Sequence, residues 1–266
     1  MLHHHKKNLQ SAFHQMKQQT DFSPRNPIVN KTLSAFVENL SDIFGDFDLA
    51  KNILNDHMFD TMREEMPLLC EKAECEMEFF WAEHFLRKGR IDIHDLKEFW
   101  YFDHYKNLCE DELRLLQGIR FKTLTFLGSG PLPMTAILMA AMLDQSNIQI
   151  KCVDYDEDAV RVSRALIRNL GLSDKVTIIQ EDAAQYKPQK DEVLICASLM
   201  KDAQTVYTNL KNSPAAYCLV RDAEGVYQFL YMPAIKPDHQ DYDLIDLTTP
   251  AQHRINTSKL YRKIKV

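Results

Sequence analysis

Several features are scarce or missing in this sequence of 266 residues, and each absence narrows the class of protein. The six cysteines form no CxxC pair, which favours buried free thiols in a reducing compartment over disulfides or a metal site. No basic stripe accompanies the net charge of −6, which argues against a nucleic-acid partner. No apolar run approaches the ~18 residues of a membrane span, and the N-terminus lacks the apolar core of a signal peptide. We therefore expect a cytoplasmic protein that acts on small molecules and has no membrane partner.

Three consecutive histidines, His3 to His5, stand near the start of the chain. Such a run can bind metal weakly, but a mobile polar end is the simpler interpretation. No other segment has the ligand spacing of a metal site, so we predict no resident metal.

Glycine is nearly absent from residues 1–117, where only Gly45 and Gly89 occur. The apolar residues of this segment have helical spacing, and no alternating strand pattern interrupts them. We therefore predict an all-α helical-bundle domain over residues 1–117. The expected helix breaks lie at residues 21–27, at Gly45 and at residues 87–92, and a helix is expected to start near Pro67.

The pattern changes at Lys122 to short β-rich runs that alternate with helical stretches. Alternation of this kind predicts a parallel, doubly wound sheet, which makes residues 118–266 a second, α/β domain. The expected strands are TLTFLG, IQIKCVD, VTIIQED, EVLICAS, AYCLVRD and TSKLYRKIKV, and the expected helices span 131–143, 157–170 and 202–211.

A glycine turn follows the first expected strand, with Gly128 and Gly130 close to Pro131 and Pro133. Such a turn lets a ligand approach the backbone at the carboxyl edge of a sheet. Dinucleotide enzymes need a third glycine where this chain has Pro133, so a pyrophosphate is disfavoured. S-adenosylmethionine carries no phosphate and fits this turn better. The prolines fix φ and suit a stiff first helical turn.

Acidic residues follow the next two expected strands. Asp154 ends the second, about 26 residues after the turn, where a carboxylate can accept both ribose hydroxyls of a nucleoside. Glu181 and Asp182 end the third, where we expect them beside the adenine edge. An ordinary strand–helix turn with surface acids is the alternative interpretation.

The same segments carry a resemblance to the nicotianamine synthase family that extends over nearly the whole chain. FLGSGPLPMTAILMA resembles the family's glycine–proline segment, and SLMKDAQTVYTNL and LVRDAEGVYQFLYMP resemble its later elements. In the helical half, NPIVNKTLSAFVENL, LCEKAECEMEFFWAEHF and FWYFDHYKNL are similar to three further family elements. The last departs from the family's FPYY pattern, because Trp100 replaces the proline and Phe102 one tyrosine. Tyr101 or Tyr105 is left to carry any role that a tyrosine has there.

The resemblance implies a Rossmann-like, S-adenosylmethionine-dependent transferase that moves the 3-amino-3-carboxypropyl group onto an amine and releases methylthioadenosine. It implies that the helical half is a lid over the carboxyl edge of the sheet. Because an α-amino group is largely protonated at neutral pH, a nearby base would help to form the neutral amine. Glu78 is the residue that the resemblance implies for this role. Glu74 lies one helical turn earlier, and both carboxylates could equally be solvated helix acids.

Three classes of site residue are expected from the resemblance. Tyr101 and Tyr105 orient the amine or relay its proton, with aromatic packing as the alternative. Arg221 is expected to clamp a substrate carboxylate, with an ion pair to Asp222 or Glu224 as the alternative. The remaining contacts are Glu74 and Tyr231 with the substrate, and Gly128, Ser129, Gly130, Pro131, Asp154, Tyr155, Asp182, Ala183 and Ala197 with S-adenosylmethionine.

Three products remain open at this point. Condensation of three S-adenosylmethionine molecules would make nicotianamine. A single transfer onto histidine would make the intermediate of a bacterial opine-type, staphylopine-like metallophore. An ordinary small-molecule methyltransferase shares the fold and would release S-adenosylhomocysteine instead. A homodimer is also left open.

Overall fold

The computed structural model describes residues 2–143, 147–198, 200, 202–249 and 255–264. The chain divides into two compact units. The helical unit comprises Met1–Phe80, Asp222–Ala234 and Thr249–Thr257, and the sheet unit comprises Trp81–Arg221, Ile235–Thr248 and Ser258–Val266. These units differ from the two expected segments, because residues 81–117 lie with the sheet and two later segments lie with the helices.

The helical unit is built from α1 (Leu2–Lys17), α2 (Pro27–Phe44), α3 (Phe47–Leu54), the 3-10 turn η1 (His57–Phe59) and the first part of α4 (Asp60–Arg87). A later 3-10 turn, η3 (Gly225–Phe229), joins them. Local sequence starts these helices: the Asn26 side chain accepts a hydrogen bond from Ile28 N, and that of Asp46 accepts one from Leu49 N. Pro27 occupies the first turn of α2, where its missing N–H costs nothing.

Three of the expected helix breaks agree with the structure. The segment 21–27 separates α1 from α2, Gly45 caps the end of α2, and α4 ends at Arg87. Pro67 does not lie near a helix start, because it is inside α4, seven residues after Asp60. The three histidines are helical residues of α1 and not a mobile end, and His5 Nδ1 lies 2.6 Å from Asn39 Oδ1.

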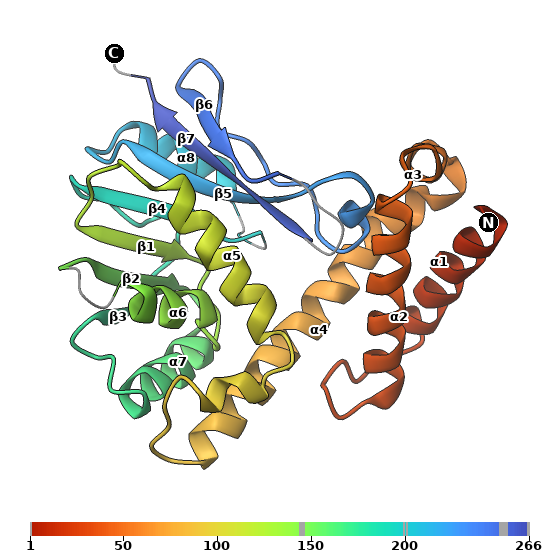
Figure 1. Cartoon of the computed structure of the whole chain (residues 1–266), viewed down its shortest axis with the longest axis horizontal. Coiled ribbons are helices and arrows are strands. Elements are labelled where there is room, and N and C mark those ends of the chain that lie inside the picture. Colours follow the sequence, from red (N-terminus) through yellow and green to blue (C-terminus); the bar gives the residue numbers. More distant parts are fainter. Residues whose placement is uncertain (1, 144–146, 199, 201, 250–254, 265–266) are drawn as a thin grey trace. The chain divides into compact units, whose positions relative to one another are not determined.

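The sheet unit contains a seven-stranded sheet of order β3-β2-β1-β4-β5-β7-β6, seen in Figure 1. Parallel pairing joins β1 to β2 and β4, β2 to β3, and β4 to β5. This confirms the Rossmann-like arrangement, in which the chain reverses direction across the sheet between β1 and β4. The strand bounds are β1 Thr123–Leu127, β2 Gln149–Asp154, β3 Val176–Gln180, β4 Glu192–Cys196, β5 Tyr217–Ala223, β6 Tyr242–Leu247 and β7 Asn256–Lys263.

The sheet is not wholly parallel, because β6 and β7 pair antiparallel. The strand β6 was not expected from the sequence. Only Tyr242 is buried in it, and the other five residues are exposed, so it lacks the continuous apolar run that marks the central strands. A bulge between Leu244 and Asp246 further obscures its alternation.

Helices cover both faces of this sheet. In Figure 1, α5 (Phe102–Leu115) and α6 (Met134–Met142) lie in front of the strands and α8 (Ala203–Lys211) lies behind them. The remaining elements are α7 (Glu157–Asn169), which contacts β3, and the 3-10 turn η2 (Asp95–Glu98). The helix α6 starts at Met134 rather than at Pro131, so both prolines precede it and stiffen the loop instead of its first turn.

No helix in the described part of the chain is both long enough and apolar enough to cross a bilayer. Across the same residues, no three His, Cys, Asp or Glu side chains are grouped so that they could hold a metal ion. No disulfide joins any of the six cysteines, which all lie among the described residues, and all but Cys75 are buried. Burial raises the pKa of the Cys196 thiol to about 12, and the other buried thiols shift in the same direction, so these cysteines are unreactive at neutral pH.

Candidate functional site

The glycine turn lies at the carboxyl end of β1 and needs its two glycines. Gly128 and Gly130 have φ of 76° and 67°, a region that other residues enter only at a cost. A Cβ on Gly128 would also lie 3.4 Å from Cβ of Ala197, at the end of β4. Gly128 N and Ser129 N donate to Val153 O at 2.9 and 3.3 Å, so the turn is tied to β2.

Asp154 is the acidic residue at the tip of β2, and its carboxylate organises the backbone around the turn. Its Oδ2 accepts a 2.7 Å bond from Gly130 N, and its Oδ1 accepts a 3.0 Å bond from Asp156 N. The residue is 8% exposed. A carboxylate has about four lone-pair sites, so these two bonds leave capacity for a ribose hydroxyl. Asp154 can therefore position the turn and receive a ligand at once.

The ends of β3 and β4 complete this edge of the sheet. Asp154 O accepts from Glu181 N at 3.0 Å, which places the residues after β3 beside the tip of β2. Asp182 Oδ1 then accepts from Ala184 N at 2.8 Å and holds the Asp182–Ala183 turn. Tyr155, directly after Asp154, is exposed and offers an aromatic face at the same edge. The expected S-adenosylmethionine contacts thus gather at the carboxyl ends of four strands.

Tyr101 and Tyr105 lie at the start of α5 within a cluster of aromatic rings. Their ring centroids are 5.7 Å apart and nearly perpendicular. Phe99 contacts both rings, and His104 stacks on Tyr101 at 4.5 Å. The packing fixes the direction of both phenol groups, so aromatic packing is compatible with the chemical role expected of these tyrosines. Phe102, which stands where the family has a tyrosine, is buried.

Three expected site residues belong to the helical unit. Glu74 and Glu78 lie four residues apart in α4, so they share a helix face. Tyr231 follows η3, and its backbone N donates to Tyr227 O at 3.2 Å. The structure brings the two glutamates together and leaves Tyr231 on a separate segment of that unit.

Arg221, at the end of β5, is buried and already holds a carboxylate. Its Nε and Nη2 donate to Glu112 Oε1 and Oε2 at 2.7 and 2.8 Å, which is a bidentate pair. From the sequence we expected a substrate carboxylate as the partner of Arg221, with Asp222 or Glu224 as the alternative. In the structure the carboxylate bound by the Arg221 guanidinium is that of Glu112. Burial opposes the charge of Arg221, but Glu112 outweighs it, so the pKa of the guanidinium is raised.

Glu112 is the residue that sequence reasoning missed. It stands in the run CEDELR and resembles an ordinary acidic residue of an exposed helix face. Helical periodicity could have identified it, because Cys109 and Leu116 are three residues before and four after it, and both are buried. A charge on that buried face requires a partner.

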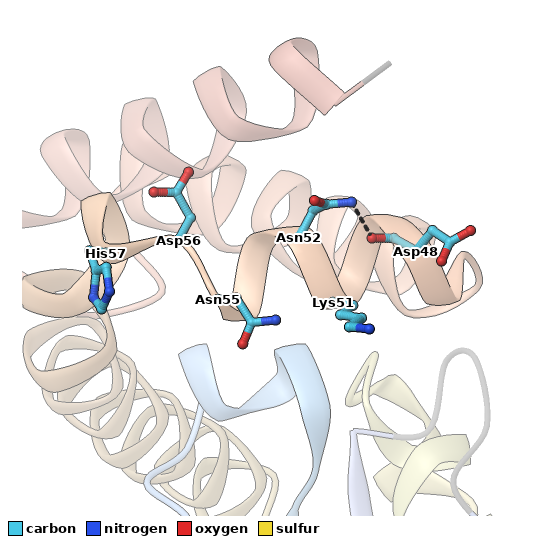
Figure 2. Close-up of a pocket in the computed structure, with 6 residues that line it drawn as sticks. All are labelled: Asp48, Lys51, Asn52, Asn55, Asp56 and His57. Atoms are coloured by element: carbon cyan, nitrogen blue, oxygen red, sulfur yellow. Dashed lines mark hydrogen bonds between the residues drawn. The ribbon is translucent and has the colours of Figure 1, made fainter.

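A separate hollow of about 560 Å³ lies in the helical unit. Figure 2 shows that its side chains do not converge, because Asn52 and Asp56 point to one side of the chain, and Lys51 and Asn55 point to the other. Asp56 is also paired with Lys6. We assign no ligand to this hollow, which is lined by Asp48, Lys51, Asn52, Asn55, Asp56 and His57.

Comparison with known proteins adds to this geometry. A model of the nicotianamine synthase protein family matches residues 5–266. The probable nicotianamine synthase 4 of Arabidopsis thaliana is 27% identical over 217 residues, which cover 76% of this chain and 66% of the relative. The nicotianamine synthase of Solanum lycopersicum is 28% identical over 221 residues, 77% of this chain and 68% of the relative. The aligned part spans about two thirds of these plant proteins.

Solved structures share the fold over almost the full length. A glutamate-to-glutamine variant of MtNAS superposes with a TM-score of 0.84 at 22% identity and covers 99% of this chain and 98% of that chain. MtNAS in complex with MTA and tNA superposes with a TM-score of 0.80 at 22% identity, over 97% of this chain and 98% of that one. At these identities the likeness establishes the fold.

Proposed function

Because the chain belongs to the nicotianamine synthase family, we propose that it transfers the 3-amino-3-carboxypropyl group of S-adenosylmethionine onto an amine. Methylthioadenosine is the leaving product. The observation that carries this proposal is the glycine turn, whose backbone is shaped by two left-handed glycines and held by Asp154 at the carboxyl edge of the sheet. That edge is where open α/β sheets bind their ligands.

In this reaction the main task of the protein is to align S-adenosylmethionine with the acceptor amine. The nitrogen of the acceptor amine attacks the methylene carbon beside the sulfonium. A C–N bond forms, the C–S bond breaks, and its electron pair neutralises the sulfur of methylthioadenosine. The sulfonium makes the carbon electrophilic without any resident metal, so orientation and a neutral amine are the remaining requirements.

We propose Glu78 as the base that takes the proton of the acceptor ammonium, and Glu74 as a contact of the acceptor. A positioned carboxylate can supply ~10²–10⁴-fold in rate. Tyr101 and Tyr105 orient the amine, which the fixed directions of their rings support. Ser129, Pro131, Tyr155, Asp182, Ala183 and Ala197 line the S-adenosylmethionine side together with both glycines, and Tyr231 contacts the substrate.

The acceptor amine separates the candidate products. We propose nicotianamine, made by repeated transfer, because the curated relatives carry that name. A single transfer onto histidine remains the alternative acceptor chemistry. Methyl transfer from the same ligand would break a different C–S bond and would leave S-adenosylhomocysteine.

Mass spectrometry of the purified protein tests these candidates in one experiment. The protein is incubated with S-adenosylmethionine alone, with L-histidine and with D-histidine. Nicotianamine and methylthioadenosine formed without histidine support the proposal. A product that requires histidine replaces the first acceptor by the second, and release of S-adenosylhomocysteine would refute aminocarboxypropyl transfer.

We also propose a cytoplasmic location, because the five buried cysteines form no disulfide and a reducing compartment keeps thiols in that state. Histidine as a partner and a homodimer stay predictions. Sedimentation of the purified protein with and without S-adenosylmethionine would decide the dimer.

A further inference from the structure

Four polar side chains from four elements of the sheet unit meet in its interior. Glu112 comes from α5, Thr135 from α6, Arg221 from β5 and Ser258 from β7. They are 0%, 6%, 9% and 0% exposed. Burying charged groups is costly unless every one is paired, so this cluster requires an explanation.

Each group in the cluster has a partner of matching chemistry. Beyond the bidentate pair, Ser258 Oγ donates to Glu112 Oε1 at 2.8 Å. Arg221 Nη2 also donates to Thr135 Oγ1 at 3.1 Å. The carboxylate thus accepts three bonds, and the guanidinium fixes the hydroxyl of Thr135 in one direction.

Thr135 connects this cluster to the glycine turn. It is the second residue of α6, and the helix begins directly after Pro133. Ile137 N donates to Pro133 O at 3.0 Å, so the last residue of the loop accepts a hydrogen bond from the first turn of the helix. Cys109 Sγ lies 3.8 Å from Thr135 O and ties the same residue to α5.

The cluster also shares a face of α5 with Tyr105, one of the aromatic residues of the candidate site. Tyr105, Cys109 and Glu112 are spaced by four and three residues in α5, so they share one face of that helix. Arg221 and Tyr105 are close enough to interact electrostatically. The same ion pair therefore supports the glycine turn through Thr135 and the Tyr105 turn through α5.

Stability alone does not account for such a pair. A buried ion pair can often be replaced by apolar residues of similar size without loss of stability. Its advantage is direction, because a bidentate fork holds its partners at one angle. We propose that Glu112 and Arg221 are positioning residues that fix the start of α6, and with it the glycine turn, in the geometry that binds S-adenosylmethionine.

The identity of the ligand rests on the proposed function, but the positioning role is tested by affinity and not by turnover alone. Thr135→Val removes the acceptor of Arg221 with little change of shape, and Thr135→Ser restores it. We expect the dissociation constant of S-adenosylmethionine, measured by calorimetry, to rise about tenfold in the valine variant, since a charge-assisted bond is lost. The serine variant should remain close to the wild type.

Glu112→Gln disturbs both supports at once. We expect kcat/KM for methylthioadenosine release to fall on the order of 100-fold, because misplaced groups lose much of the benefit of orientation. Glu192→Gln is the matched control, since Glu192 is equally buried among hydroxyl and ammonium donors but lies at the amino end of β4. This control should lower the melting temperature and leave the S-adenosylmethionine affinity unchanged.

If Glu112→Gln does not fold, the double variant Glu112→Leu with Arg221→Met replaces the pair by apolar groups and should fold. Weaker S-adenosylmethionine binding in that folded variant supports positioning. Wild-type affinity in the double variant, or in Thr135→Val, would overturn it. A wild-type protein that binds S-adenosylmethionine without releasing methylthioadenosine would refute the proposed function and leave the affinity comparison valid. A wild-type protein that does not bind it would refute both.

Discussion

The glutamates of α4 differ in exposure to solvent although they are close in sequence. Glu74 and Glu78 share one face, whereas Glu76 is exposed two residues away from each. The helix therefore supplies its own control for the proposed base. A general effect of removing negative charge from α4 would be the same at Glu76 and Glu78.

We predict that Glu78→Gln keeps S-adenosylmethionine affinity and loses ~10²–10⁴-fold in turnover, because glutamine cannot accept the proton of the amine. Methylthioadenosine release, followed by mass spectrometry, measures the loss. Glu76→Gln should turn over like the wild type. Equal activity of the two variants would remove Glu78 from the mechanism.

Gly128 is constrained by its backbone and by a neighbour, and Gly171 only by its backbone. Both have positive φ, but a Cβ on Gly171 would meet nothing within 4 Å. We predict that Gly128→Ala and Gly171→Ala each cost ~1–2 kcal/mol in free energy of unfolding. Only Gly128→Ala should also weaken S-adenosylmethionine binding. Urea unfolding and calorimetry separate the two effects, and equal affinity in both variants would place the ligand elsewhere.

Among the elements, β4 carries a buried polar cluster at its first residue. The Glu192 carboxylate accepts bonds from Thr125 Oγ1, from Tyr186 OH at 2.5 Å and from Gln189 N at 2.6 Å. Lys151 Nζ lies 3.3 Å away. Burial opposes ionisation, but these donors outweigh it, so the pKa of Glu192 lies below its ordinary value of 4.5.

A lowered pKa in the folded state stabilises the fold above pH ~4.5, and this stabilisation is lost as the pH falls through the folded value. We predict that Glu192→Gln costs ~1–3 kcal/mol at pH 7, and that its difference from the wild type shrinks below pH ~4.5. Urea unfolding from pH 7 to pH 4 and below measures both. Glu110→Gln, at an exposed ion pair with Lys106, should follow the wild type. A pH-independent difference would contradict the assignment.

At the scale of the whole molecule, neither unit is one continuous segment. The helical unit includes Asp222–Ala234, which begins with the last two residues of β5. In this segment Tyr227 stacks on Phe44 at 5.1 Å, and Phe229 contacts the ring of Phe59 at 5.9 Å. Its aromatic core is therefore incomplete without Tyr227 and Phe229, which lie 183 and 170 positions after the rings that they contact.

We predict that a fragment of residues 1–80 does not unfold cooperatively, because it lacks the rings of Tyr227 and Phe229 that pack on Phe44 and Phe59. Adding residues 222–234 through a flexible linker should restore a cooperative thermal transition by circular dichroism. The same fusion with Tyr227→Ala serves as the control, and its free energy of unfolding should be ~3–5 kcal/mol lower because a buried ring is removed. A sharp transition in the fragment alone would show that the helices are sufficient.

The sequence by itself determined the family, the central strands and the glycine turn. These depend on local rules. Gly128 and Gly130 meet the need for a positive φ, Asp154 ends a strand whose preceding residues are buried, and the central strands β1 and β4 are buried almost throughout. These features could therefore be predicted from residues that are close together in the sequence, without knowledge of any long-range contact.

Only the tertiary structure decided the partner of Arg221, the existence of β6 and the division into units. Glu112 and Arg221 are 109 positions apart, and their pairing depends on how α5 packs beside β5. The strand β6 is held by pairing with β7 and not by its own apolar pattern. Long-range pairing of this kind leaves no periodicity in one sequence, because its energy lies in contacts between segments and not within them.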